Sequence, residues 1–210
     1  MGCHPKSATD FSPKAEEGLR RCLQHEKFVA LGEIGLDYSG TFKQHEEIQK
    51  VVFSRQIKIA LDYNKPLVIH CRDAEEECLE ILEKMVPKNY KIHCHCFMGN
   101  FESAQKWLNL FPNLYIGLTP VVTYKTAVPT QNVARFIPLE RLLLETDAPY
   151  FIPRSFPKHE VKYSHPGMAV VVAEAVARLR NCTVVEVLRH CRQNTKNMYG
   201  RRVLDIPIVL

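Results

Sequence analysis

Short apolar segments alternate along this chain with amphipathic segments of helical periodicity, and this alternation restricts the fold more than any other feature. Strands are expected at residues 28–33, 66–70, 90–95, 114–118 and 141–146. Helices are expected at residues 44–63, 74–85, 101–111, 130–136, 167–180 and 184–199. Continuous apolar strands separated by helices are typical of parallel βαβ units. The sequence therefore predicts an α/β fold with a parallel sheet.

The length of the chain limits the architecture further. Its 210 residues suit one hydrophobic core, so we expect a single domain over residues 1–210. A closed (β/α)8 barrel takes about 250 residues. Two folds remain: an open doubly wound sheet, or a barrel that is incomplete at its N-terminus. The start at Gly2-Cys3-His4-Pro5 resembles the loop after a strand, and the motifs described below favour the incomplete barrel.

Composition excludes several classes of protein. With 46% hydrophobic and 24% charged residues, the chain is neither disordered nor collagen-like. The apolar runs are too short to span a bilayer, and no apolar region of a signal peptide follows Met1. Eight cysteines in a chain of this size indicate unpaired thiols in a reducing compartment, cytoplasmic or nuclear. The net charge of +5 favours anionic binding partners.

Four of the five expected strands lead into an ionisable residue that could bind a metal ion: Glu33, His70, His95 and Asp147. Barrel enzymes carry their active sites at the carboxyl ends of parallel strands, so we expect these side chains to converge there. Two imidazoles and two carboxylates suit Zn²⁺ or Mn²⁺ better than a pure Mg²⁺ or Ca²⁺ site.

Each of these residues alone is more often structural, as a turn residue, a helix cap or a hydrogen-bonded core histidine. Their recurrence at successive strand ends favours the metal site. By contrast, we interpret His93 as a core residue, because it lies one layer deeper than His95 on the same face of the strand. Cys94 and Cys96 face the other way, and a zinc site there has poor geometry. Asp37 is expected to cap a loop.

Five ordered motifs carry a resemblance to a known family. They are Gly2-Cys3-His4-Pro5, Gly32-Glu33-Ile34-Gly35-Leu36-Asp37, Pro66-Leu67-Val68-Ile69-His70-Cys71-Arg72, His95-Cys96-Phe97-Met98-Gly99 and Leu144-Glu145-Thr146-Asp147-Ala148-Pro149-Tyr150. From Gly2 to about Tyr199 the chain resembles the TatD family of metal-dependent deoxyribonucleases, and within it the animal TatD-domain-containing protein 2 type. The resemblance implies a TIM-type (β/α)8 metallo-dependent hydrolase barrel.

The resemblance also implies a metal centre of Zn²⁺, Mn²⁺ or Mg²⁺. In the family two ions are usual and Glu33 would bridge them. One ion would use Glu33, His70 and His95, and the other would use a His-x-His pair, Glu33 and Asp147. No such pair precedes Gly2-Cys3-His4-Pro5. We therefore expect a barrel without roughly three of its eight βα units, and a site that holds one ion.

The implied activity is metal-dependent hydrolysis of DNA or RNA, exonucleolytic by resemblance. Glu33 and Asp147 would be catalytic, with Asp147 orienting the attacking water or accepting its proton. The candidate substrate-binding residues are Arg72, His4, Arg154, Lys158, Tyr150 and His165. Several of them belong to the basic and aromatic loop 150–166, where cations suit phosphates and rings suit bases. A solvated loop with packed rings is the alternative.

Three function classes stay open at this point. With one ion the chain would be a nuclease of weak or absent activity, because phosphodiester hydrolysis gains from two ions. The same ligands could serve a metal-dependent amidohydrolase that attacks C–N or C–O bonds. A catalytically dead relative that binds nucleic acid is the third class. The basic, aromatic loop favours the nuclease over the amidohydrolase.

Overall fold

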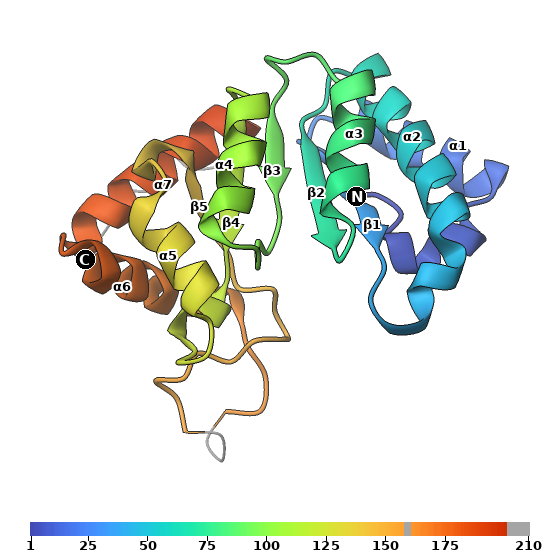
Figure 1. Ribbon diagram of the computed structural model, residues 1–210. Coiled ribbons are helices and arrows are strands. Elements are labelled where there is room, and N and C mark those ends of the chain that lie inside the picture. The colour runs from blue at the N-terminus through green and yellow to red at the C-terminus, as the bar shows by residue number, and fades with distance from the viewer. Residues whose placement is uncertain (158–160, 201–210) are drawn as a thin grey trace. The chain divides into compact units, whose positions relative to one another are not determined.

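The computed structural model describes residues 1–157 and 161–200 of the chain (Figure 1). These residues fall into two compact units, and each is described by itself. The first unit comprises residues 1–95 and 110–114, and the second comprises residues 96–109 and the described residues from 115 onward. A single hydrolase domain over residues 1–210 stays a prediction.

Three parallel strands form the centre of the first unit: β1 (Leu31–Asp37), β2 (Leu67–Arg72) and β3 (Ile92–Cys94). They lie in the order β1-β2-β3, with Ile34 opposite Ile69 and Ile69 opposite Cys94. The apolar side chains of the strands are buried, and Leu31, Ile34 and Ile69 are fully inaccessible. This burial accounts for the continuous apolar character of these segments.

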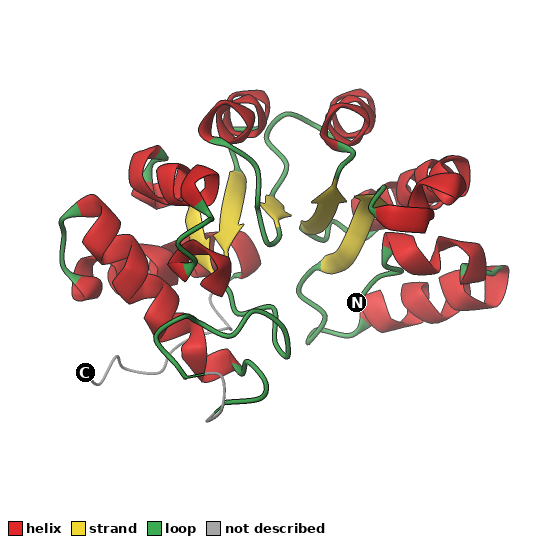
Figure 2. Ribbon diagram, turned by 60° about the horizontal axis from the view of Figure 1, so that its bottom comes forward, coloured by secondary structure: helices red, strands yellow, loops and turns green. Residues whose placement is uncertain are grey.

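The helices of the first unit are η1 (Pro5–Asp10), α1 (Pro13–Gln24), η2 (Gly40–His45), α2 (Glu46–Asp62) and α3 (Glu75–Met85). Helix α2 packs against β1 and α3 packs against β2 (Figure 2). The sequence pattern predicts no element before residue 28, yet η1 and α1 lie there. The oxygen of Ser12 caps α1 by accepting the Ala15 N–H at 3.2 Å, with Pro13 as the first helical residue.

Apart from Leu110 and Leu114, which belong to the first unit, the second unit contains α4 (Phe101–Leu110), β4 (Leu114–Leu118), η3 (Pro120–Thr123), α5 (Val128–Phe136), η4 (Leu139–Arg141), β5 (Leu142–Leu144), η5 (Pro166–Met168), α6 (Ala169–Arg180) and α7 (Val184–Tyr199). Strands β4 and β5 are parallel, with Ile116 opposite Leu142. Helices α6 and α7 pack against each other and against β5. Thr183 caps α7, because its Oγ1 accepts the Glu186 N–H at 3.2 Å.

The predicted strands and helices are all present, but the position of β1 is a correction. It begins at Leu31 and continues to Asp37, so Glu33 lies inside the strand and not at its end. His70 likewise lies inside β2. Gly35 lets β1 continue, since it has a φ of +145° and a Cβ atom there would overlap the carbonyl oxygen of His70. Among the described residues, no helix combines the length and apolar character needed to cross a membrane.

Candidate metal centre

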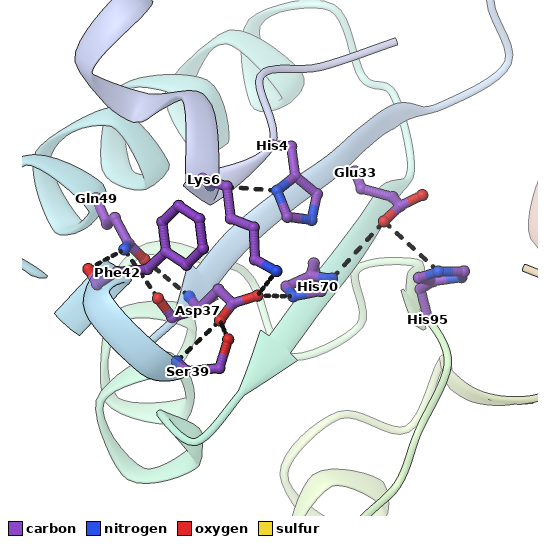
Figure 3. Close-up of polar contacts among 9 residues, drawn as sticks. All are labelled: His4, Lys6, Glu33, Asp37, Ser39, Phe42, Gln49, His70 and His95. Carbon is purple, nitrogen blue, oxygen red and sulfur yellow. Dashed lines mark hydrogen bonds and ion pairs between the residues drawn. The ribbon is translucent and has the colours of Figure 1, made fainter. Parts of the chain in front are cut away.

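Three neighbouring strands of the first unit each supply one of the predicted ligands (Figure 3). Glu33 lies on β1, His70 lies on β2, and His95 follows β3 directly. The backbone N–H of His95 donates to the Ile69 carbonyl at 2.9 Å, which continues the β2–β3 pairing past the end of β3. The parallel order of the strands is therefore what brings these three side chains together.

The imidazoles of His70 and His95 both lie close to the carboxylate of Glu33. Its Oε2 lies 3.7 Å from His70 Nδ1 and 3.5 Å from His95 Nε2. Four-coordinate zinc has ligand distances of about 2.0–2.2 Å, which separates neighbouring donor atoms by roughly 3.3–3.6 Å. The two observed separations are close to that range and longer than ordinary hydrogen bonds. Each of the two imidazole nitrogens therefore lies at a separation from Glu33 Oε2 that suits joint ligation of a divalent ion.

A third imidazole, that of His4, belongs to the same cluster. Ligand atoms of His4, Glu33 and His70 all lie within 4.8 Å of one another, and within the described residues no other group of three or more potential metal ligands is this close. The rings of His4 and His70 meet edge to face, with centroids 4.3 Å apart. His4 was predicted to bind substrate, and the structure brings it beside two of the predicted metal ligands.

Asp37 contacts the His70 imidazole of this cluster through its carboxylate. Its carboxylate is fully buried, and Oδ2 lies 3.0 Å from His70 Nε2 and 3.4 Å from Lys6 Nζ. Its Oδ1 accepts hydrogen bonds from the backbone N–H and the hydroxyl of Ser39. The predicted capping role is confirmed by the Ser39 contacts, whereas the contact with His70 was not predicted. A carboxylate behind a ligating histidine fixes the ring and its tautomer.

The backbone of Asp37 is held as firmly as its side chain. Its N–H donates to Gln49 Oε1 at 2.8 Å, and Gln49 Nε2 donates back to the Asp37 carbonyl at 2.9 Å. Gln49 Nε2 also donates to the Phe42 carbonyl at 3.0 Å. Gln49 lies on α2 and is buried, so the helix packed on β1 also positions Asp37.

The protonation states suit metal binding. His70, and then His95 and His4, outweigh the effect of burial and hold the pKa of Glu33 below its ordinary value. Burial, followed by the neighbouring His70, lowers the pKa of His4. Burial alone would raise the pKa of Asp37, but hydrogen bonds from Ser39 and His70 outweigh it and the net shift is downward. At neutral pH both carboxylates are therefore ionised and His4 is neutral.

Glu33 is accessible from solvent. A pocket of about 300 Å³ opens beside it, lined by Met1, Lys27, Phe28, Val29, Ala30, Gly32, Glu33 and Val68. The Glu33 side chain is 37% exposed, whereas those of His70 and His95 are 19% and 11% exposed. The Glu33 carboxylate is thus more accessible to solvent than the imidazoles of His70 and His95.

Asp147, the fourth predicted ligand, lies in the second unit after β5. It has a φ of +50°, and its carbonyl accepts the Tyr150 N–H at 2.9 Å, so it begins a turn. Nearby, Glu145 Oε2 accepts the Cys96 N–H at 2.8 Å, which ties the segment after β3 to the end of β5. Metal ligation by Asp147 stays a prediction.

The predicted substrate-binding residues of the second unit lie on the loop after Asp147. The guanidinium of Arg154 lies over the Tyr124 ring at 4.8 Å, and its backbone N–H donates to Thr123 Oγ1. Tyr150 is 67% exposed, and His165 is also exposed. Lys158 lies outside the described residues. In the first unit, Arg72 ends β2 as an exposed residue on the same face of the strand as His70.

Two further expectations concern the strand that carries His95. His93 is 5% exposed, which confirms that it is a core residue. Cys94 is buried, and the thiol of Cys96 contacts Thr119 Oγ1 at 3.6 Å. The ligand cluster in the described part of the chain contains no cysteine.

Comparison with known proteins agrees with the architecture and the motifs. The sequence matches the TatD related DNase family over residues 1–200. It is 45% identical to the human 3'-5' RNA nuclease TATDN2 over 95% of this chain and 26% of that protein. It is 35% identical to YabD of Bacillus subtilis, named as an uncharacterized metal-dependent hydrolase, over 95% of this chain and 76% of that protein.

A solved structure shows the same fold. YjjV, a TatD homologue from Escherichia coli, superposes with a TM-score of 0.85 at 28% sequence identity, covering 96% of this chain and 76% of its own. The chain thus spans about a quarter of the human relative and about three quarters of the two bacterial ones. It belongs to the TatD related DNase family of metal-dependent hydrolases, whose fold is a TIM-type barrel.

Proposed function

We propose that this chain hydrolyses phosphodiester bonds of single-stranded nucleic acid from the 3' end, with a divalent ion held by Glu33, His70 and His95. The observation that carries the proposal is the meeting of two imidazole nitrogens from neighbouring strands at one carboxylate oxygen, at 3.7 and 3.5 Å. A divalent ion bound there would polarise a phosphoryl oxygen and make water a better nucleophile.

The tautomer of His70 supports ligation through Nδ1. Asp37 is ionised and can only accept, so His70 Nε2 donates to it across the 3.0 Å contact. When His70 is neutral, Nδ1 carries no proton and can bind a metal ion; when the ring is protonated, its Nδ1–H faces the Glu33 carboxylate and lowers the pKa of Glu33. Two electron-rich atoms facing each other repel unless a cation or a proton lies between them. A metal ion is the cation that this arrangement suits.

Asp147 is the residue that we assign to proton transfer. As a carboxylate it would orient the attacking water and accept its proton. In this role it would complete a set of two carboxylates and two imidazoles. Zn²⁺ and Mn²⁺ suit this set, and Mg²⁺ is the third ion to test.

Features of the second unit support a nucleic acid as the substrate. The Arg154 guanidinium lies over the Tyr124 ring, and Tyr150 and Tyr163 are 67% and 69% exposed. Cations bind phosphates, and exposed rings stack on the bases of single strands. The relative named as an RNA nuclease supports RNA, and the family's name supports DNA. We propose that both are substrates.

A degradation assay tests the proposal. Single-stranded RNA and DNA oligonucleotides labelled at the 5' end are incubated with the chain and Mn²⁺, Zn²⁺ or Mg²⁺, and with a chelator as the blank. We expect slow shortening from the 3' end, because one ion is less effective than two, and this shortening should disappear with the chelator. Glu33→Gln should reduce the rate by more than the roughly 10- to 100-fold cost of altering a residue that only supports a ligand.

The matched control is Glu47→Gln, because the Glu47 side chain is 83% exposed on α2 and outside the cluster. It should degrade the oligonucleotides at the rate of the unaltered chain. Turnover of a panel of small amides and esters without oligonucleotide cleavage would instead identify an amidohydrolase. Salt-dependent binding of oligonucleotides without metal-dependent turnover would identify a binding protein and contradict the proposal.

A further inference from the structure

Three of the eight cysteines belong to elements of the first unit that adjoin the metal centre. Cys71 follows His70 directly on β2, Cys78 lies near the start of α3, and Cys94 lies on β3. Cys78 and Cys94 are buried, whereas Cys71 is half-buried. The proposed function uses none of these thiols, although one of them is the chain neighbour of a candidate ligand.

The side chain of Cys71 lies on the face of β2 opposite to His70. Successive residues of a strand alternate between its two faces, so Cys71 shares its face with the fully buried Ile69. Cys94 pairs with Ile69 in the sheet and therefore lies on the same face. The thiols of β2 and β3 thus point away from the cluster of imidazoles.

Helix α3 brings Cys78 to this face. The helix packs against β2, and only Asp73 and Ala74 separate the two elements in the chain (Figure 2). The Cys78 N–H donates to the Ala74 carbonyl at 3.0 Å, which places Cys78 at the first helical hydrogen bond. Its side chain is completely inaccessible, as expected for a residue on the side of a helix that covers a strand. Cys71 and Cys78 therefore meet between β2 and α3.

The electrostatics of the buried thiol agree with this placement. Burial, and then interaction with the Cys71 thiol, raise the pKa of Cys78 well above its ordinary value, and Cys94 has a smaller effect. Cys71 is thus the thiol that acts most strongly on Cys78. At neutral pH Cys78 is protonated and shielded, so an oxidant in solution reaches the half-buried Cys71 first.

We propose that Cys71 and Cys78 are an oxidation-sensitive pair that hydrogen peroxide converts to a disulfide. Peroxide first oxidises the Cys71 sulfur by two electrons: an S–O bond forms, the O–O bond breaks, and the second oxygen leaves as water with the thiol proton. The Cys78 sulfur then attacks this sulfenic acid, so that the S–S bond forms and the S–O bond breaks. The hydroxide that departs takes the proton of Cys78 and leaves as water.

The disulfide would weaken the metal centre through His70. A disulfide holds its sulfur atoms about 2.05 Å apart, closer than two thiols that only touch. Formation of the bond therefore draws the end of β2 toward α3, and His70 moves with its neighbour. This displacement changes the 3.7 Å separation between His70 Nδ1 and Glu33 Oε2 that suits joint ligation. The consequence rests on the proposed function, because it takes His70 to be a ligand.

Peptide mapping tests the disulfide without metal or turnover. The chain is treated with hydrogen peroxide, its remaining thiols are alkylated, and trypsin separates Cys71 from Cys78 by cutting after Arg72. We expect the two peptides to be cross-linked and to separate on reduction. In Cys78→Ala the sulfenic acid of Cys71 should persist and react with dimedone. The matched control is Cys182→Ser, at a half-buried cysteine of the second unit, and it should form the same cross-link.

Calorimetric titration with Zn²⁺ tests the effect on the metal centre. Oxidation of the unaltered chain should lower its affinity by about 10- to 100-fold, the cost of altering a residue that supports a ligand. Reduction with a phosphine should restore the affinity. Cys71→Ser cannot form the bond, so its affinity should be the same before and after peroxide. Cys182→Ser should lose affinity on oxidation as the unaltered chain does.

Three results would overturn the inference. They are the absence of any cross-link, a cross-link between Cys78 and Cys94 in place of Cys71, and equal Zn²⁺ affinity of the reduced and oxidised chains. Failure of the proposed function is distinguishable, because it appears as absent oligonucleotide turnover in the reduced, unaltered chain. The mapping and the titration need no turnover.

Discussion

The Nε2 atom of His70 lies 3.0 Å from Oδ2 of Asp37, and this carboxylate is completely shielded from solvent. Asp37 also accepts hydrogen bonds from Ser39, and its backbone is held by Gln49 from α2. A buried and fully engaged carboxylate has little freedom to move. The orientation of His70, and with it the direction of Nδ1 toward Glu33, is therefore determined by the packing of α2 on β1.

Asp37→Asn tests this relationship. In this variant the amide oxygen still accepts the hydrogen bonds from Ser39, and the amide N–H points at His70 Nε2. Nε2 must then be the acceptor, so the ring proton moves to Nδ1. We expect metal affinity to fall by about 10- to 100-fold, measured by calorimetric titration with Zn²⁺. Asp10→Asn, at an exposed position of η1, is the control and should bind the ion normally. Equal affinities in the two variants would show that Asp37 does not position the ligand.

The number of metal ions is the second prediction. Glu33, His70 and His95 provide donors for one ion, so we expect one tightly bound ion per chain by native mass spectrometry. Glu33→Gln and His95→Asn should each lose it, because three ligands are the usual minimum for a catalytic site. Two tightly bound ions per chain, or retention of the ion in both variants, would contradict this ligand set.

A pH-dependent contribution to stability is expected at Glu16 on α1, remote from the metal centre. Burial alone would raise the pKa of Glu16, but hydrogen bonds from Arg55 and Arg20 outweigh it and the net shift is downward. A carboxyl with a lowered pKa stabilises the fold above its unfolded pKa of about 4.3, and this contribution is lost as the pH falls through the folded value. The stabilisation should therefore be full at pH 7 and absent in strong acid.

The measurement is the thermal unfolding temperature of Glu16→Gln at several pH values. This variant should unfold at a lower temperature than the unaltered chain at pH 7, and the difference should shrink as the pH falls below about 4. Glu17→Gln, at the neighbouring exposed residue, is the control. Its unfolding temperature should equal that of the unaltered chain at every pH. A gap that is constant with pH would assign the effect to packing rather than to charge.

Asn194 connects α7 to β5 and provides the fourth prediction. Its Nδ2 donates to the carbonyls of Leu139 and Leu142, each at 2.8 Å, and the residue is 3% exposed. Asn194→Ala leaves these carbonyls without that donor and should cost about 1–3 kcal/mol. A change of 1 kcal/mol lowers the melting temperature by about 2–4 °C at this chain length. Asn197→Ala, on an exposed position of the same helix, should leave it unchanged.

Much of the architecture follows from the sequence alone. The apolar runs predict the strands because a parallel strand is buried on both faces, and this burial is local to each run. The spacing of Glu33, His70 and His95 on successive strands also predicts that they gather, since parallel strands align their ends. The strand expected at residues 28–33 begins before β1 does, because residues 28–30 are as apolar as the strand that follows them.

Only the tertiary structure decided what each side chain of the cluster does. Asp37 contacts His70, and His4 packs on His70, through contacts between residues up to 66 positions apart in the chain, which no local pattern encodes. The tautomers depend on single hydrogen bonds, from Lys6 to His4 and from His70 to Asp37, and these exist only once strand register and helix packing are formed. Local hydrophobicity thus determines where the elements lie, while the chemistry of the imidazoles depends on neighbours brought close by folding.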